Sequence, residues 1–120
     1  MNPFADHGLY KDKITISQVI QYLGKYGVEY KKSTIQYYLS IRLIPALHGG
    51  RYYEKKHLQL LYVIYFLKDI FALDVISMAI SPYFDEPSEL VAMFGDASHD
   101  EPTIKPMIKA AVLVHKNMNS

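Results

Sequence analysis

The chain has 120 residues, of which 50% are hydrophobic and 21% are charged, and its formal net charge is +1. This composition is typical of one folded domain with its own core and excludes an intrinsically disordered chain. Cysteine is absent, which excludes disulfides and thiolate chemistry.

The apolar segments argue against export and membrane insertion. The first thirteen residues, "MNPFADHGLYKDK", lack the apolar stretch of a signal peptide. The longest apolar run, "LLYVIYFL", is followed by Lys68 and Asp69 and is much shorter than the ~18 residues that a membrane span needs. We therefore expect a cytoplasmic protein that has no membrane partner.

Charge is distributed unevenly along the chain. Residues 1–68 carry ten Lys/Arg and four Asp/Glu, a balance of +6, and residues 69–120 carry three Lys and eight Asp/Glu, a balance of −5. Ten of the eleven tyrosines lie in the first 65 residues. The basic, tyrosine-rich part is typical of a surface that contacts an anionic partner, whereas the alternative is an ordinary fluctuation of surface charge.

A flexible arm (residues 1–13) and then a first helix are expected at the N-terminus. The helix is predicted by "ITISQVIQYLGKYG", in which Thr15 and Gln18 have the spacing of a capping box. Gly24 or Gly27 can end it. Its apolar face is formed by Ile16, Val19, Ile20 and Leu23.

A second helix is predicted from about Lys32 to Ile41. At about 100° per residue, the inward side holds Ile35, Tyr38, Leu39 and the stem of Arg42. The outward side holds Ser33, Gln36, Tyr37 and Ser40. Lysines at positions 31 and 32 add positive charge at the helix N-terminus, where free N–H groups already favour anions.

A short hairpin and two further helices follow. "PALHGGRYY" predicts the hairpin, with Gly49 and Gly50 supplying positive φ. "EKKHLQLLYVIYFLKDIF" predicts a third helix, and "LDVISMAI" predicts a fourth. Because the segment Leu60–Leu67 is apolar on all sides, it needs burial on more than one side, by the domain core or by a partner subunit.

The last forty residues are expected to form a helical extension that dimerises (residues 81–120). A turn-rich break, "SPYFDEP", precedes a short helix, "SELVAMFG", and an acidic loop, "DASHDE". A final helix from Thr103 has an apolar stripe formed by Ile104, Met107, Ile108, Ala111 and Val112.

The order of these elements resembles the winged helix-turn-helix DNA-binding domain of the MerR family over roughly residues 14–76. The most specific segments are Tyr37-Tyr38 followed by Leu43, Arg51-Tyr52-Tyr53, and Phe71 with Leu73 and Ile76. The chain is also similar to a group of small bacterial MerR-like proteins. The resemblance implies a mostly α fold, with a MerR-like domain at residues 14–80, a short β-hairpin wing and a C-terminal helical extension.

The chain departs from the MerR pattern at several points. It has Gln36 where these proteins usually carry Arg, and Arg42 where they carry Gly. The connection between the first two helices is longer by about five residues. The cysteines of metal-sensing members and the long dimerising helix are missing, so the resemblance implies no metal sensing.

The resemblance implies that the second helix enters the major groove and that the wing contacts phosphates. Neutralisation of phosphates is expected from Lys31, Lys32, Arg42, Arg51, Lys55 and Lys56. Hydrogen bonds to the DNA backbone are expected from Ser33, Tyr37 and Tyr52. Gln36 can make a bidentate contact to adenine, worth ~1–3 kcal/mol of discrimination. The alternative is a solvated basic face beside a tyrosine-rich core edge.

We expect a DNA-binding transcriptional regulator that acts as a homodimer on double-stranded DNA and is not an enzyme. No catalytic motif, cofactor site or metal-ligand spacing of the five histidines is present. An effector, either a small molecule or a protein, is a further partner whose identity the sequence does not specify. The alternative function is a protein-interaction or ligand-sensing module of the same fold. In it, either the wing and the second helix face a protein partner, or an apolar ligand contacts Tyr62, Tyr65, Phe66, Phe71, Tyr83 and Phe84. These aromatic residues also fit an ordinary core.

Overall fold

The computed structural model describes residue 4 and residues 13–95, with side chains described up to residue 92. Within this part of the chain the helices are α1 (Ile16–Gly24), α2 (Lys32–Ser40), α3 (Lys55–Leu67), α4 (Leu73–Ile80), the 3-10 helix η1 (Ser81–Tyr83) and α5 (Ser88–Gly95). The predictions of a mostly α fold and of five α-helices in these segments are confirmed. The predicted final helix and most of the N-terminal arm lie outside the described residues.

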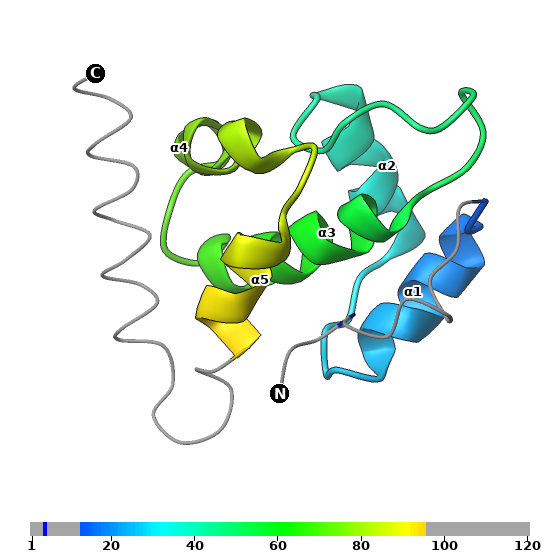
Figure 1. Ribbon diagram of the computed structural model, residues 1–120, viewed down its shortest axis with the longest axis horizontal. Coiled ribbons are helices and arrows are strands. Elements are labelled where there is room, and N and C mark those ends of the chain that lie inside the picture. The colour runs from blue at the N-terminus through cyan, green and yellow to red at the C-terminus, as the bar shows by residue number, and fades with distance from the viewer. Residues whose placement is uncertain (1–3, 5–12, 96–120) are drawn as a thin grey trace.

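Helix α3 forms the centre of the fold (Figure 1). It packs against α1, α4 and α5, and α1 packs against α2. Nine of its 13 residues are buried. The apolar segment Leu60–Leu67 is therefore covered within a single chain, apart from the partly buried Tyr65 and Phe66. This segment does not require a partner subunit.

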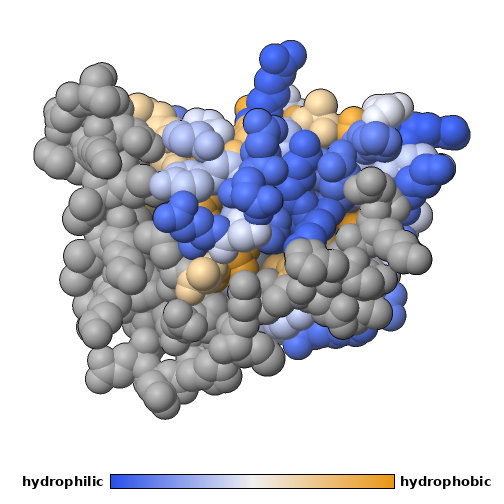
Figure 2. Space-filling model, viewed as in Figure 1, coloured by the Kyte–Doolittle hydropathy of each residue, from blue (hydrophilic) through white to orange (hydrophobic). Residues whose placement is uncertain are grey.

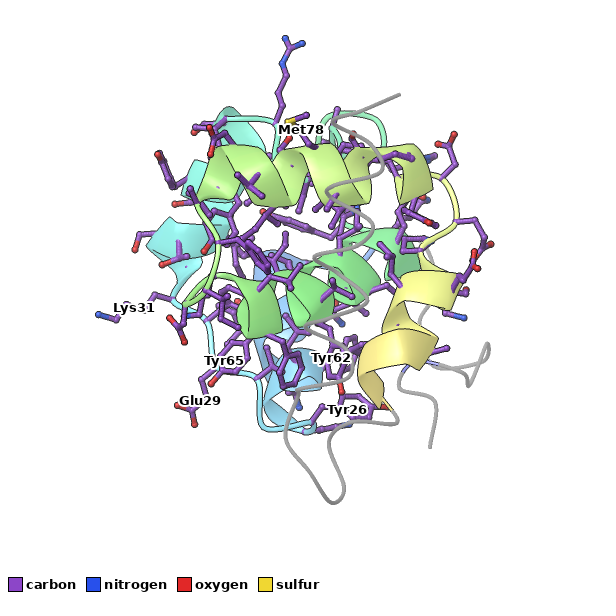
Figure 3. All side chains as sticks on the ribbon, turned by 90° about the vertical axis from the view of Figure 1, so that its left-hand side faces the viewer. Tyr26, Glu29, Lys31, Tyr62, Tyr65 and Met78 are labelled. Atoms are coloured by element: carbon purple, nitrogen blue, oxygen red, sulfur yellow. The ribbon has the colours of Figure 1, made fainter. Side chains whose placement is uncertain are left out.

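Aromatic rings fill the space between α3 and the end of α1. Phe4 is buried and lies edge-on to Tyr26 and Tyr62, with ring centroids 4.7 and 5.7 Å away. Figure 3 shows Tyr26 and Tyr62 close together at this end of the molecule. Tyr62 is only 2% exposed and also contacts Phe66, so it belongs to the core.

The start of α1 confirms the predicted capping box. The Thr15 N–H donates to Gln18 Oε1 at 2.9 Å, and the Gln18 N–H donates to Thr15 Oγ1 at 3.2 Å. The helix ends at Gly24, and Gly27 has a φ of 76° in the turn that follows. That turn returns the chain to the core through the buried Val28.

The predicted β-hairpin wing is wrong. No strand forms in residues 13–95; His48 and Tyr52 make one isolated bridge, although Gly49 and Gly50 do adopt positive φ values of 60° and 73°. The next pair of the ladder would use the Glu54 N–H. That group instead donates to Nδ1 of His57 at 2.9 Å, at the start of α3.

The residues on either side of the glycine turn are held by other partners. Nε2 of His57 lies 2.8 Å from the Pro45 carbonyl oxygen. Tyr53 exchanges two backbone hydrogen bonds, of 2.9 and 3.0 Å, with Ile14 just before α1. The segment is consequently a short loop tied to α1 and α3, which we call the 46–53 loop.

No helix in the described part of the chain has the length and apolar character to cross a membrane.

Candidate nucleic-acid interface

The two faces of α2 are separated as its sequence predicts. Ile35 is fully buried and Tyr38 is 5% exposed, whereas Tyr37 is 53% exposed. Ser33 and Gln36 are exposed beside Tyr37. The tyrosine pair is thus divided between the core and the surface, and the outward face of α2 carries hydrogen-bonding groups.

Tyr30 fixes α2 against the central helix. Its hydroxyl donates to the Leu61 carbonyl oxygen at 2.6 Å, and its ring lies edge-on to Tyr38 with centroids 6.0 Å apart. Burial raises the pKa values of both Tyr30 and Tyr38, so the two hydroxyls stay neutral. Sequence reasoning missed this residue, because a single tyrosine between two helices has no periodic pattern.

Two lysines stand at the N-terminal end of α2. Lys31 is the N-cap residue and makes no side-chain cap, and both Lys31 and Lys32 are exposed. Figure 3 shows Lys31 extending away from the protein body, on the same side as Glu29. The first turn of α2 contains no acidic residue.

The polar side chains on α2 differ in whether they already form a hydrogen bond within the protein. The Ser40 hydroxyl donates to the Tyr37 carbonyl oxygen at 2.6 Å and is already used. The Gln36 amide is exposed and has no hydrogen bond to any residue described. Of these two groups, Gln36 is the one available to bind another molecule.

Arg42 lies outside the position that the helical pattern predicts for it. The helix has already ended, Ile41 is the C-cap, and Arg42 adopts the left-handed conformation with a φ of 61°. The Arg42 N–H bonds to Leu39 O at 3.2 Å and the Leu43 N–H bonds to Tyr38 O at 2.9 Å, which is a Schellman motif. The Arg42 side chain is exposed instead of packing on the inward face.

Arg51 is exposed at the turn of the 46–53 loop, while Tyr52 is partly buried. Figure 2 shows hydrophilic side chains gathered at the upper right, where Figure 1 draws this loop and the start of α3. Lys55 and Lys56 are partly buried there. Lys56 Nζ lies 4.0 Å from Glu54 Oε2, so its charge is partly offset.

The structure divides the ten predicted site residues into two groups. One group lies on the exposed side and at the N-terminal end of α2: Lys31, Lys32, Ser33, Gln36 and Tyr37. The other lies on the 46–53 loop and at the start of α3: Arg51, Tyr52, Lys55 and Lys56. Arg42 is next to the loop, since it lines one pocket together with Leu47 and Gly50. Lys31 stands at the opposite end of α2, about 14 Å away along a nine-residue helix.

Metal ligation has no support from the side chains that the structure places. No group of three His, Asp or Glu in the described ranges is arranged to hold an ion. His48 Nδ1 lies 3.5 Å from Glu54 Oε1, and His57 is buried with both ring nitrogens bonded.

Comparison with known proteins identifies the family of the chain. Residues 3–94 match the model of a family described as Domain of unknown function (DUF1836). No curated protein and no solved structure matches the chain.

Proposed function

We propose that this chain, which belongs to the DUF1836 family, binds double-stranded DNA and regulates transcription. One observation carries the proposal: the outward face of α2 presents Gln36 and Tyr37 between positive charge at both helix ends. Helix α2 would enter the major groove, and the 46–53 loop would contact the phosphate backbone. We assign no catalytic activity to this arrangement.

The charge and the anchoring of α2 support this proposal. The balance of +6 in residues 1–68 favours contact with phosphates, and the acidic residues are concentrated after residue 68. Helix α1, its turn and α2 follow one another as in a helix-turn-helix, although the described residues form no β wing. The Tyr30 contacts hold α2 at a fixed angle to the core, which base readout requires.

A protein-interaction module is the second candidate. It is favoured by the exposed apolar area of Tyr37 (53%) and Ile41 (42%) on α2, together with the overall net charge of only +1. Salt distinguishes the two functions. DNA binding weakens steeply as salt rises because counterions are released, whereas an apolar protein interface shows little such dependence.

The first experiment selects bound fragments from random duplex DNA at low salt and then measures affinity by fluorescence anisotropy. We expect Arg51→Ala to weaken binding to every sequence and to reduce the salt slope by about one counterion. Lys68→Ala is the matched control, because Lys68 is equally charged and exposed but follows α3. No binding at low salt, or equal losses in both variants, would contradict the proposal.

The same selected site tests base readout. Gln36→Ala should relax the preference at one base position by ~1–3 kcal/mol and leave affinity for non-specific DNA nearly unchanged. Tyr37→Phe should instead weaken binding to all sequences slightly, because backbone contacts carry no sequence information. If the Gln36 variant keeps its base preference, α2 does not read bases through this residue.

The proposal includes a homodimer that binds two-fold-symmetric sites. The burial of Leu60–Leu67 within one chain removes one reason to expect it. The other reason, the apolar stripe at 104–112, lies outside the described residues. Light scattering decides the matter: a dimer has about twice the 13.8 kDa mass of the chain, and a monomer at micromolar concentration would rule this part out.

A further inference from the structure

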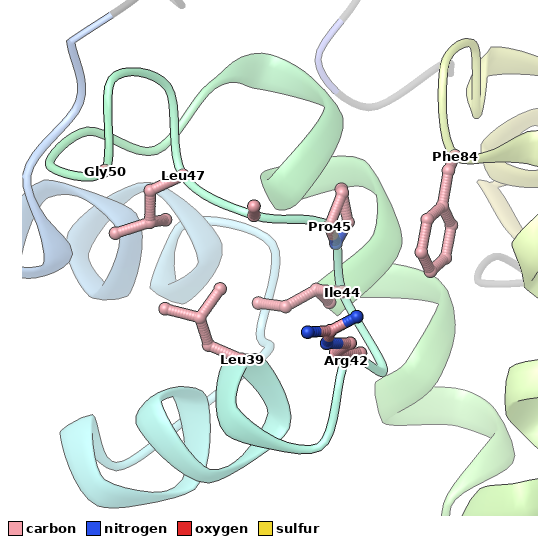
Figure 4. Close-up of a pocket in the computed structure, with 8 residues that line it drawn as sticks. Leu39, Arg42, Ile44, Pro45, Leu47, Gly50 and Phe84 are labelled. Carbon is pink, nitrogen blue, oxygen red and sulfur yellow. The ribbon is translucent and has the colours of Figure 1, made fainter.

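A pocket of about 530 Å³ lies between the C-terminal end of α2, the segment that follows it and Phe84 (Figure 4). Its size is within the range of small-molecule sites. Leu39 contributes from α2, and Phe84 contributes from the residue after η1. The remaining lining residues are Arg42, Ile44, Pro45, Ala46, Leu47 and Gly50.

The pocket combines apolar walls with one cation. Among the described residues that line it, only Arg42 is charged. Arg42 is exposed and forms no ion pair with any residue the structure places. Figure 4 draws Arg42 among the side chains that line the pocket, together with Ile44 and Phe84. A ligand with an apolar body and a negative group matches this lining.

The turn that carries Arg42 does not itself require an arginine. The residue occupies the left-handed position of the Schellman motif, where glycine is the usual choice. A side chain there carries a conformational cost, since the left-handed region is unfavourable for residues with a Cβ. The chain nevertheless places a guanidinium at this point, beside an apolar pocket, where it forms no ion pair with any described residue. An unusual backbone conformation of this kind often marks a functional position.

We propose that this pocket binds a small apolar carboxylate. The hydrocarbon part would lie against Leu39, Ile44 and Phe84, and the carboxylate would accept two hydrogen bonds from Arg42. Guanidinium is well suited to this role, because its planar donors match the two carboxylate oxygens. A neutral molecule of the same shape would gain the apolar contacts but not the charged pair.

The position of the pocket gives such a ligand a regulatory role, which rests on the proposed DNA binding. One wall belongs to α2 and another to the 46–53 loop, so the ligand touches both proposed DNA contacts. Its carboxylate would occupy Arg42 and bring negative charge close to the DNA phosphates. Binding of the carboxylate should therefore weaken binding to DNA.

The binding test uses octanoate, with octanol as the neutral probe, and follows backbone amide NMR signals of the full chain without DNA. We expect octanoate to shift signals from residues 39–50 and Phe84. Arg42→Gln keeps a side chain of similar reach but removes the charge, and it should weaken octanoate about tenfold while leaving octanol unchanged. Lys68→Gln, the control, should bind octanoate like the wild type. Unchanged amide spectra away from the pocket show that Arg42→Gln folds.

Three results would overturn the carboxylate site: no octanoate binding, equal affinity of the wild type and Arg42→Gln, or signal changes confined to residues elsewhere. The DNA arm adds octanoate to a preformed protein–DNA complex. Because Arg42 is itself a proposed phosphate contact, Arg42→Gln should bind DNA more weakly, so each protein is compared with its own DNA affinity in the absence of octanoate. A relative loss on adding octanoate in the wild type that is absent in Arg42→Gln supports the regulatory role, and an equal relative loss in both contradicts it. If octanoate binds but the chain does not bind DNA at all, the proposed function fails and the carboxylate site stands.

Discussion

Buried His57 is held in one neutral tautomer by its two neighbours. The Glu54 N–H can only donate, so Nδ1 of His57 must accept, and Nε2 carries the proton that is donated to Pro45 O. Adding a proton to Nδ1 would break the first bond at the start of α3. Burial lowers the pKa of His57 below its ordinary value of 6.5, with Lys56 acting in the same direction and Glu54 opposing it.

This arrangement predicts that acid destabilises the fold. In the unfolded chain His57 takes up a proton near pH 6.5, whereas in the folded chain it does so only at lower pH. Between the folded pKa and 6.5 the unfolded state binds more protons, so the free energy of unfolding falls as pH falls below about 6.5. Denaturant unfolding across this window should show the effect in the wild type and a flatter dependence in His57→Gln.

The control for the His57 prediction is His48→Gln. His48 is exposed in the 46–53 loop and lies near Glu54, as His57 does. Comparing this variant with His57→Gln separates the effect of the buried ring from that of removing any histidine near Glu54. A His57→Gln curve that runs parallel to the wild-type curve would show that other groups cause the acid effect.

At the scale of elements, the end of α2 stores a small strain at Arg42. A left-handed residue with a Cβ costs ~1–2 kcal/mol, and glycine avoids this cost but loses ~0.5–1 kcal/mol through its freer unfolded chain. Arg42→Gly should therefore raise the free energy of unfolding by up to ~1 kcal/mol, as measured by denaturant titration. Gln36→Gly, on the helical part of α2, should lower it by about 0.5–1 kcal/mol. A loss in both variants would mean that the Arg42 side chain stabilises the turn.

The helices follow from local signals, and this is why the sequence predicts them well. The capping box at Thr15, the inward spacing of Ile35 and Tyr38, and the glycine turn at Gly49 all act within a few residues. The same local logic predicted strands around the glycine turn. It failed there because the Glu54 N–H, which a hairpin would need, bonds to His57 instead. That hydrogen bond forms only once α3 is in place.

The candidate site shows the same division between local and distant causes. Exposure of Gln36 and Tyr37 follows from the period of α2 and could be predicted. The same period wrongly predicts an inward position for Arg42, because the helix ends before this residue. The pocket beside it brings Leu39 together with Phe84, which is 45 positions later, so no local pattern in the sequence predicts it.

The described part of the molecule is organised around α3, which joins α1 and α2 to α4 and α5. It packs against α1, α4 and α5. Its Leu61 carbonyl oxygen also accepts the hydrogen bond from the Tyr30 hydroxyl, which positions α2. A cavity in this helix should therefore weaken the entire fold at once. The Leu61 side chain is 0% exposed, which makes it a direct test of this shared core.

Leu61→Ala should lower the free energy of unfolding by ~2–5 kcal/mol, through lost burial and the cavity left behind. That is a large share of the ~5–15 kcal/mol typical of a domain. Ile70→Ala removes a similar volume from a side chain that is 46% exposed, and it should change stability by no more than about 0.5 kcal/mol. Because all the helices depend on α3, circular dichroism and tyrosine fluorescence should report one coincident transition in both variants. Two separated transitions in Leu61→Ala would instead show that the α1–α2 unit folds independently of α4 and α5.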